Sequence, residues 1–151
     1  MDAGLRLLGR RAHSTSELKT KLGRRGYLAE EIESAVGRLK ELGYLDDRSF
    51  AAGHVRRRQA GRGPRALAGE LAARGVRRDI ADTALLEFDS EAQVAAATLL
   101  AERLYARGAW PGYREVLNSI GPKLLRRGFS PAVARAACGA AWSGAHPDSE
   151  A

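Results

Sequence analysis

The chain has 151 residues, a formal net charge of +7 and an isoelectric point near 10.2. This length suits one ordinary domain or a row of small units that are not stable alone. Valine, isoleucine and threonine together number only 13, which favours helix over strand because β-branched residues suit a pleated surface. The excess of positive charge indicates an anionic partner, such as nucleic acid, an acidic protein face or an anionic membrane surface.

Three features favour a cytoplasmic protein. No uncharged run reaches the roughly 18 residues of a membrane span. The first residues include Asp2 and Arg6, where a secretory signal would be apolar. The single cysteine, Cys138, excludes an internal disulfide and fits a reducing compartment.

The first three predicted helices occupy residues 1–45. Ser14 and Glu17 form a capping-box pattern at the start of the second helix, in which each side chain satisfies the other's backbone N–H. That helix ends at Gly26, a residue suited to a left-handed cap, and Gly43 ends the third helix. The expected buried positions are Leu5 and Leu8; Leu18 and Leu22; and Ile32, Val36, Leu39 and Leu42.

Three more predicted helices occupy residues 46–89. Asp46 or Asp47 can cap the first of them. The link at 61–63 lacks the Lys-Ser/Thr of a phosphate-binding loop, so we expect a hinge there. Pro64 suits the first turn of the next helix. The expected buried positions are Phe50, Ala51 and Val55; Leu67 and Leu71; and Ile80, Ala84 and Leu85.

The last three predicted helices occupy residues 90–143. Pro122, inside the second of them, should cause a kink or a restart because proline removes a backbone hydrogen bond. Ser130-Pro131 is an N-cap followed by proline and begins the third. After Trp142 the periodicity stops, which predicts a flexible tail. The expected buried positions of the long helix at 91–107 are Val94, Ala97, Ala101 and Leu104.

One pattern recurs three times along the chain. It reads Leu18-Leu22-Gly26, then Leu67-Leu71-Gly75, then Ile120-Leu124-Gly128, with offsets of 49 and 53 residues. A period near 50 residues indicates an array of similar supersecondary units. We therefore predict an all-α fold of three tandem three-helix repeats. Their ranges are 1–45, 46–89 and 90–143, with the tail at 144–151.

The chain resembles the RecX family of bacterial regulators of the RecA recombinase. The resemblance spans roughly residues 5–142. It rests on Ser16-Glu17-Leu18 with Leu22 and Gly26; Leu42-Gly43-Tyr44-Leu45-Asp46-Asp47 with Phe50 and Ala51; Gly61 and Gly63; Glu70-Leu71 with Gly75-Val76; and Leu124, Arg127, Gly128 and Phe129.

This resemblance implies an elongated, curved array without enzymatic activity. It also implies binding in the helical groove of the RecA–single-stranded DNA filament. Proteins of this kind restrain the ATPase, strand exchange and co-protease activity of RecA in recombination, DNA repair and the SOS response.

Arginines are the candidate contact residues. Residues 55–78 contain eight arginines and one acid, Glu70. Arginine suits phosphate or carboxylate because its planar fork donates two parallel hydrogen bonds. Two structural alternatives stay open: a solvated basic face, and cations placed beside the negative ends of helices. The candidates are Arg56, Arg57, Arg58, Arg62, Arg65, Arg74, Arg77 and Arg78, followed by Arg24, Arg25, Arg126 and Arg127.

Other motifs do not indicate catalysis. Asp46-Asp47 is better explained by helix capping than by a metal or acid–base pair. The three histidines, His13, His54 and His146, share no ligand-like spacing. Cys138 lies in an alanine-rich stretch and is expected to be inert core. We expect no enzyme activity, no metal and no cofactor.

Three functions remain open at this point. The first is a monomeric regulator of the RecA filament, in which changing Arg57 and Arg58 to Glu should abolish inhibition. The second is a protein that binds single- or double-stranded DNA directly, because three-helix units resemble helix-turn-helix modules. The third is a helical scaffold for some other acidic protein.

Overall fold

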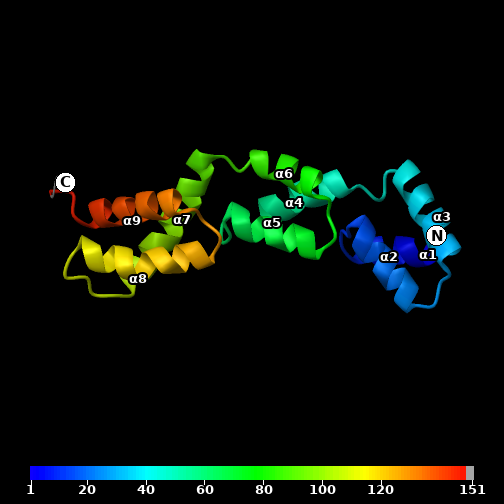
Figure 1. Cartoon of the computed structure of the whole chain (residues 1–151), viewed down its shortest axis with the longest axis horizontal. Helices are drawn as coiled ribbons and strands as arrows, with labels where there is room; N and C mark the ends of the chain where they lie inside the picture. The colour runs from blue at the N-terminus through cyan, green and yellow to red at the C-terminus, as the bar shows by residue number, and fades with distance from the viewer. Residues whose placement is uncertain (149–151) are drawn as a thin grey trace. The chain divides into compact units, whose positions relative to one another are not determined.

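The structure, a computed structural model, describes residues 1–148. Within this range the chain is all-α, with nine helices and no strand (Figure 1). The helices are α1 (Asp2–Arg10), α2 (Thr15–Arg24), α3 (Ala29–Glu41), α4 (Asp47–Arg58), α5 (Pro64–Ala73), α6 (Arg78–Leu86), α7 (Ser90–Ala106), α8 (Tyr113–Arg126) and α9 (Pro131–Ala145).

The helices form two compact units. The first unit contains residues 1–54 and 68–84, and the second contains residues 55–67 and the chain from Leu85 on. Helices α1–α3 belong wholly to the first unit and α7–α9 wholly to the second, whereas α4, α5 and α6 contribute to both. The division into repeats at 1–45, 46–89 and 90–143 stays a prediction.

The three-times-repeated pattern has the same structural role in each copy. All six of its leucine and isoleucine side chains are at most 3% exposed. Gly26, Gly75 and Gly128 have φ values of 91°, 74° and 95°, a region in which side chains are strained. After each glycine, the next N–H donates to the carbonyl of the last leucine in the pattern, which closes a Schellman turn. The prediction of a repeated leucine–glycine module is confirmed.

The helix caps follow the sequence signals. Ser14 and Glu17 form the predicted capping box. Asp46 accepts hydrogen bonds from the N–H groups of Arg48 and Ser49, so it caps α4. Asp47 instead accepts from the N–H of Thr15, 2.7 Å away, in the first turn of α2. Both aspartates therefore act as caps, as expected, but on two different helices.

The core of the first unit corrects two predicted positions. Leu5 and Leu42 are 37% and 45% exposed, although both were expected to be buried. Helix α1 turns Gly4 and Leu7 inward instead, and Leu8 packs against the edge of the core. A Cβ atom on Gly4 would lie 2.8 Å from Leu39 Cδ1, so the missing side chain permits the close approach of α1.

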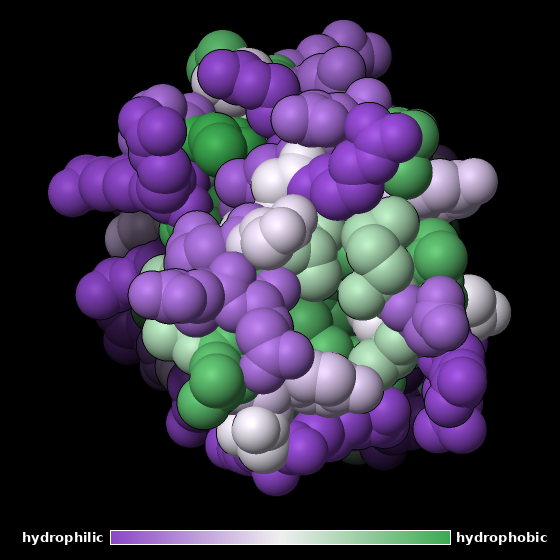
Figure 2. Space-filling model, turned by 90° about the vertical axis from the view of Figure 1, so that its right-hand side faces the viewer, coloured by the Kyte–Doolittle hydropathy of each residue, from purple (hydrophilic) through white to green (hydrophobic). Residues whose placement is uncertain are grey.

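Hydrophobic side chains remain at the surface of the first unit. In the view of Figure 2, hydrophobic surface lies among hydrophilic side chains. Tyr27 and Leu28, directly after the Gly26 turn, are 44% and 69% exposed. The residues that correspond to Tyr27 after the other two turns, Val76 and Phe129, are buried. The first turn is therefore less covered than its two counterparts.

Each internal glycine turn receives the start of the preceding pattern-bearing helix. In the first unit, Ser14 Oγ donates to the carbonyl of Arg74 over 2.5 Å, and a Cβ on Gly75 would meet the Ser16 side chain. In the second unit, the Gly63 N–H donates to the carbonyl of Arg127 over 2.8 Å, and a Cβ on Gly128 would meet Ala66. We call these two contacts the junctions.

The second junction corrects the expectation of a hinge at residues 61–63. The Arg65 N–H also donates to the Gly128 carbonyl over 3.2 Å, and Arg127 Nη1 donates to the Gly61 carbonyl over 3.3 Å. A Cβ on Gly63 would meet the backbone of Gly128. The link is therefore held against the end of α8 by three hydrogen bonds and by close backbone packing.

Two further predictions in the second unit are corrected. A kink or a restart was expected at Pro122; the restart does not occur, because helix α8 runs from Tyr113 to Arg126 through Pro122. Val116, Ile120 and Leu124 are completely buried at a spacing of four residues, which holds the helix together across the missing hydrogen bond. Helix α9 continues to Ala145, past the predicted end at Trp142. Directly after it, the His146 ring stacks on Trp142 with centroids 3.9 Å apart. Residues 149–151 of the expected tail lie outside the described residues.

Candidate anion-binding site

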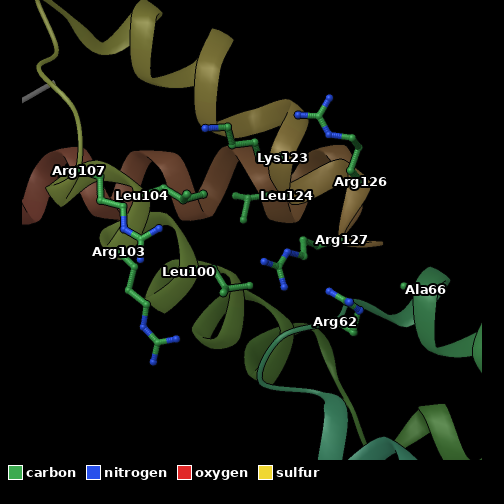
Figure 3. Close-up of a pocket in the computed structure, with 10 residues that line it drawn as sticks. All are labelled: Arg62, Ala66, Leu100, Arg103, Leu104, Arg107, Lys123, Leu124, Arg126 and Arg127. Atoms are coloured by element: carbon green, nitrogen blue, oxygen red, sulfur yellow. The ribbon is translucent and has the colours of Figure 1, made fainter.

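The second unit contains a cleft of about 740 Å³ lined by six cations. We call it the basic cleft. Figure 3 shows the side chains of Arg62 and Arg127 close to one another, and Leu100, Leu104 and Leu124 within the lining. The cationic residues are Arg62, Arg103, Arg107, Lys123, Arg126 and Arg127.

The cleft lies where two helices end. Arg103 and Arg107 lie four residues apart near the end of α7, so they share one face of it. Lys123, Arg126 and Arg127 lie at the end of α8. The carbonyl end of a helix carries about half a negative charge, so two helix ends offset only about one of the six positive charges. Most of the positive charge in the cleft is left for a ligand.

Among the described residues, no acid neutralises the cations of the cleft. Arg62 and Arg127 each donate to the Gly61 carbonyl, over 3.4 Å and 3.3 Å. These two hydrogen bonds hold both side chains beside the link at residues 61–63. Within residues 1–148, no carboxylate forms an ion pair with any of the six. An open concave surface of one sign concentrates field lines and attracts a ligand of the opposite charge.

The structure places only three of the twelve sequence-predicted arginines in this cleft, namely Arg62, Arg126 and Arg127. Among the others, Arg74 pairs with Glu17, Arg77 with Asp79 and Arg78 with Asp82. Arg24 and Arg74 also line a small hollow of about 190 Å³ in the first unit. The remaining predicted arginines are exposed and do not line the cleft; they are Arg25, Arg56, Arg57, Arg58 and Arg65.

Sequence reasoning missed Arg103, Arg107 and Lys123. The four-residue spacing of Arg103 and Arg107 near the end of a long helix was visible, but it equally suits a structural role beside the helix dipole. Their proximity to Arg62 depends on how the link at 61–65 packs on the end of α8. No pattern of neighbouring residues in the sequence predicts that packing.

Other reactive groups in the described chain have structural roles. Cys138 is completely buried, and burial raises the pKa of its thiol, so it is a poor nucleophile at neutral pH. His13 is buried between the Arg11 carbonyl and Lys21 Nζ, each 2.9 Å from one ring nitrogen. His54 is buried beside the Glu70 carboxylate at 3.8 Å. Residues 1–148 contain no group of three or more potential metal ligands and no helix able to span a membrane.

Comparison with models of known protein families shows to which family the chain belongs. The model of the RecX first three-helix domain matches residues 1–39, and that of the RecX second three-helix domain matches residues 46–85. The chain belongs to the RecX family. Both RecX domains coincide with helices predicted from the sequence, α1–α3 and α4–α6, so the predicted family and the all-α fold class are confirmed.

Named RecX proteins resemble the chain over most of its length. The regulatory protein RecX of Halorhodospira halophila is 39% identical over 141 residues, which cover 93% of this chain and 86% of that protein. The regulatory protein RecX of Mycolicibacterium vanbaalenii is 36% identical over 138 residues, covering 86% and 75%. The crystal structure of RecX from Lactobacillus salivarius superimposes with a TM-score of 0.86 at 26% identity, covering 93% and 92% of the two chains. RecX proteins are regulatory and not enzymatic, and this chain is one of them.

Proposed function

We propose that the chain regulates the RecA recombinase, mainly as an inhibitor, by binding the RecA filament on single-stranded DNA. The partner follows from membership of the RecX family, and the basic cleft supplies a surface suited to an anionic partner. By this route the chain restrains ATPase, strand exchange and co-protease activity during recombination, DNA repair and the SOS response.

The physical basis of this inhibition is contact with several neighbouring protomers. Once one part of the chain has bound, a second contact becomes intramolecular and benefits from an effective concentration of roughly millimolar. The chain should therefore bind an assembled filament far better than free recombinase subunits. By holding one arrangement of neighbouring subunits, it opposes the conformational cycling that ATP hydrolysis requires.

The observation that carries this proposal is the basic cleft in a RecX-family chain. Six cations without carboxylate partners among the described residues would bind either an acidic protein face or the phosphates of the DNA in the filament. The cleft also supports a second candidate function, which is direct DNA binding. No aromatic side chain of residues 1–148 lines it, so such binding would read the phosphate backbone and not the bases.

The decisive experiment is the ATPase rate of RecA on single-stranded DNA with increasing amounts of the chain. We expect the rate to fall at less than one chain per recombinase subunit. A variant with Arg103→Glu and Arg107→Glu should keep its helical circular dichroism spectrum and lose most of the inhibition. The comparison variant, Arg57→Glu with Arg58→Glu, makes the same change of charge and was predicted from the sequence to abolish inhibition. Because neither side chain lines the cleft, we now expect this variant to retain inhibition.

The outcomes separate the hypotheses. An unchanged ATPase rate at equimolar wild-type chain contradicts the proposed regulation. Loss of inhibition in the Arg57/Arg58 variant alone would instead place the contact on the end of α4. Direct DNA binding is measured without recombinase: phosphate-dominated binding to single strands should weaken as salt is added, with a log–log slope of about −0.7 per neutralised phosphate. Tight binding with a steep slope would favour the second candidate function.

A further inference from the structure

Each junction joins a glycine turn, which accepts a hydrogen bond, to the start of a helix, which donates it. The chain has one further turn and one further helix start of the same kinds that take part in neither junction. In both junctions, the carbonyl of the arginine before a left-handed glycine accepts a hydrogen bond from the N-cap residue of another helix. The donors differ: a side-chain hydroxyl in Ser14 and a backbone N–H in Gly63. The interface therefore tolerates variation in its donor while its acceptor turn stays the same.

The unused acceptor is the turn at Arg25 and Gly26. Arg25 is the C-cap residue of α2, as Arg127 is of α8, and Gly26 has the same left-handed backbone as Gly75 and Gly128. Among the described residues, nothing lies within 4 Å of a Cβ placed on Gly26, whereas Ser16 or Ala66 occupies that place at the other two turns. Within residues 1–148, the Arg25 guanidinium is exposed and has no hydrogen bond or ion pair.

The unused donor is the first turn of α8. Its N-cap residue is Gly112, like Gly63 in the second junction, and no side chain caps it. Residue 114 at the second helical position is arginine, as is Arg65 in the second junction, where the N–H reaches the Gly128 carbonyl. The same backbone donors are therefore present at the start of α8.

The charges of these two ends are complementary. In the first junction, Glu17 at the third helical position folds back on its N-cap residue and pairs with Arg74 over 3.2 Å. Glu115 holds the same position in α8 and also folds back, since its Oε2 lies 3.0 Å from a Cβ placed on Gly112. Arg25 precedes Gly26 as Arg74 precedes Gly75, so Arg25 is the cation that would pair with Glu115.

We propose that chains associate head to tail, the start of α8 in one copy binding the Arg25–Gly26 turn of α2 in the next. The Gly112 N–H donates to the Arg25 carbonyl, the Arg114 N–H donates to the Gly26 carbonyl, and Glu115 pairs with the Arg25 guanidinium. Such a heterologous contact leaves one donor and one acceptor free, so it can add further copies. The contact is small, so it is weak in dilute solution, where the chain is a monomer.

Adjacent copies on a common polymer are held at a local concentration of roughly millimolar, at which a weak contact becomes populated. Head-to-tail association would then make binding along a filament cooperative. The association itself is a property of the chain alone. It can therefore be tested without recombinase, and its failure would leave the proposed regulation intact.

The test is sedimentation velocity of the full chain up to about 1 mM, the concentration range that a shared polymer would impose. The sedimentation coefficient should rise with concentration, and the amide resonances of Gly26 and Gly112 should shift while that of Gly75 stays constant. Arg25→Glu or Glu115→Arg alone should weaken association by about tenfold or more, since each places like charges together. Glu87→Arg, an exposed change of the same kind away from both ends, should have no effect.

Charge exchange provides the sharpest outcome. An equimolar mixture of the Arg25→Glu and Glu115→Arg variants should associate and add copies in alternation, because position 25 of each variant then carries the charge opposite to that at position 115 of the other, whereas each variant alone places like charges together. A chain carrying both changes should regain the full concentration dependence. A sedimentation coefficient that is constant over the whole range, or single variants that associate like the wild type, would overturn the proposal.

Discussion

Gly75→Ala tests whether the junction between Ser14–Ser16 and the Gly75 turn stabilises the first unit. The substitution has two costs. A Cβ at a φ of 74° is strained by about 1–2 kcal/mol. The same Cβ meets the Ser16 side chain, and overpacking of this kind costs a further 1–3 kcal/mol or so. Moving Ser16 away would also disturb the hydrogen bond from Ser14 to the Arg74 carbonyl.

Gly26→Ala is the matched control for this prediction. Gly26 has a φ of 91° and belongs to the same unit, but nothing in the described chain lies within 4 Å of its Cβ position. Gly26→Ala should lower the free energy of unfolding only by the cost of backbone strain, because no steric clash is added. Gly75→Ala should therefore be the more destabilising by about 1–3 kcal/mol. The assay is urea unfolding followed by circular dichroism, in which the free energy of unfolding is obtained by linear extrapolation.

A third variant separates the steric term from all others. Combining Gly75→Ala with Ser16→Gly removes the atoms that collide, so the double variant should be more stable than the sum of the two single effects predicts. Equal losses in Gly75→Ala and Gly26→Ala, or strict additivity in the double variant, would refute the view that this junction is a tightly packed contact.

Two further predictions concern His13 and Pro122. Burial lowers the pKa of His13 below its ordinary 6.5, so the unfolded chain binds more protons, and the free energy of unfolding should fall as pH decreases from about 7 to 5.5. His13→Gln should flatten this dependence in urea titrations; an unchanged slope would argue against it. Pro122→Ala should raise the free energy of unfolding by about 2–2.5 kcal/mol, because a proline inside a helix costs about 3 kcal/mol and gives back less than about 1 kcal/mol by restricting the unfolded chain. A lower urea midpoint would contradict this.

The parts of the fold that depend on local chemistry could be predicted from the sequence. Ser14 with Glu17 caps α2, Pro64 begins α5, and Gly26 ends α2 in the left-handed conformation, because each depends on residues within one turn of helix. The leucine pattern was equally readable, since a four-residue spacing places both side chains on one face.

The errors arose where one segment packs on another. Leu5 was expected to be buried, yet the near-absence of a side chain at Gly4 decides which face of α1 turns inward. A kink or a restart was expected at Pro122, but no restart occurs, because the buried face of α8 maintains the helix. The basic cleft needed Arg62 to meet residues forty or more positions away, and only the packing of the link on Arg127 and Gly128 brings them together.

The position of the basic cleft along the chain has a consequence for how the family can vary. The stretches that match the RecX domain models, 1–39 and 46–85, contribute Arg62 alone to the six cations. The other five come from α7, α8 and the residues just after them. Substitutions in the last third of the sequence could therefore change the charge of the basic cleft, and with it the affinity for a polyanion, without altering the residues that match the two RecX domain models.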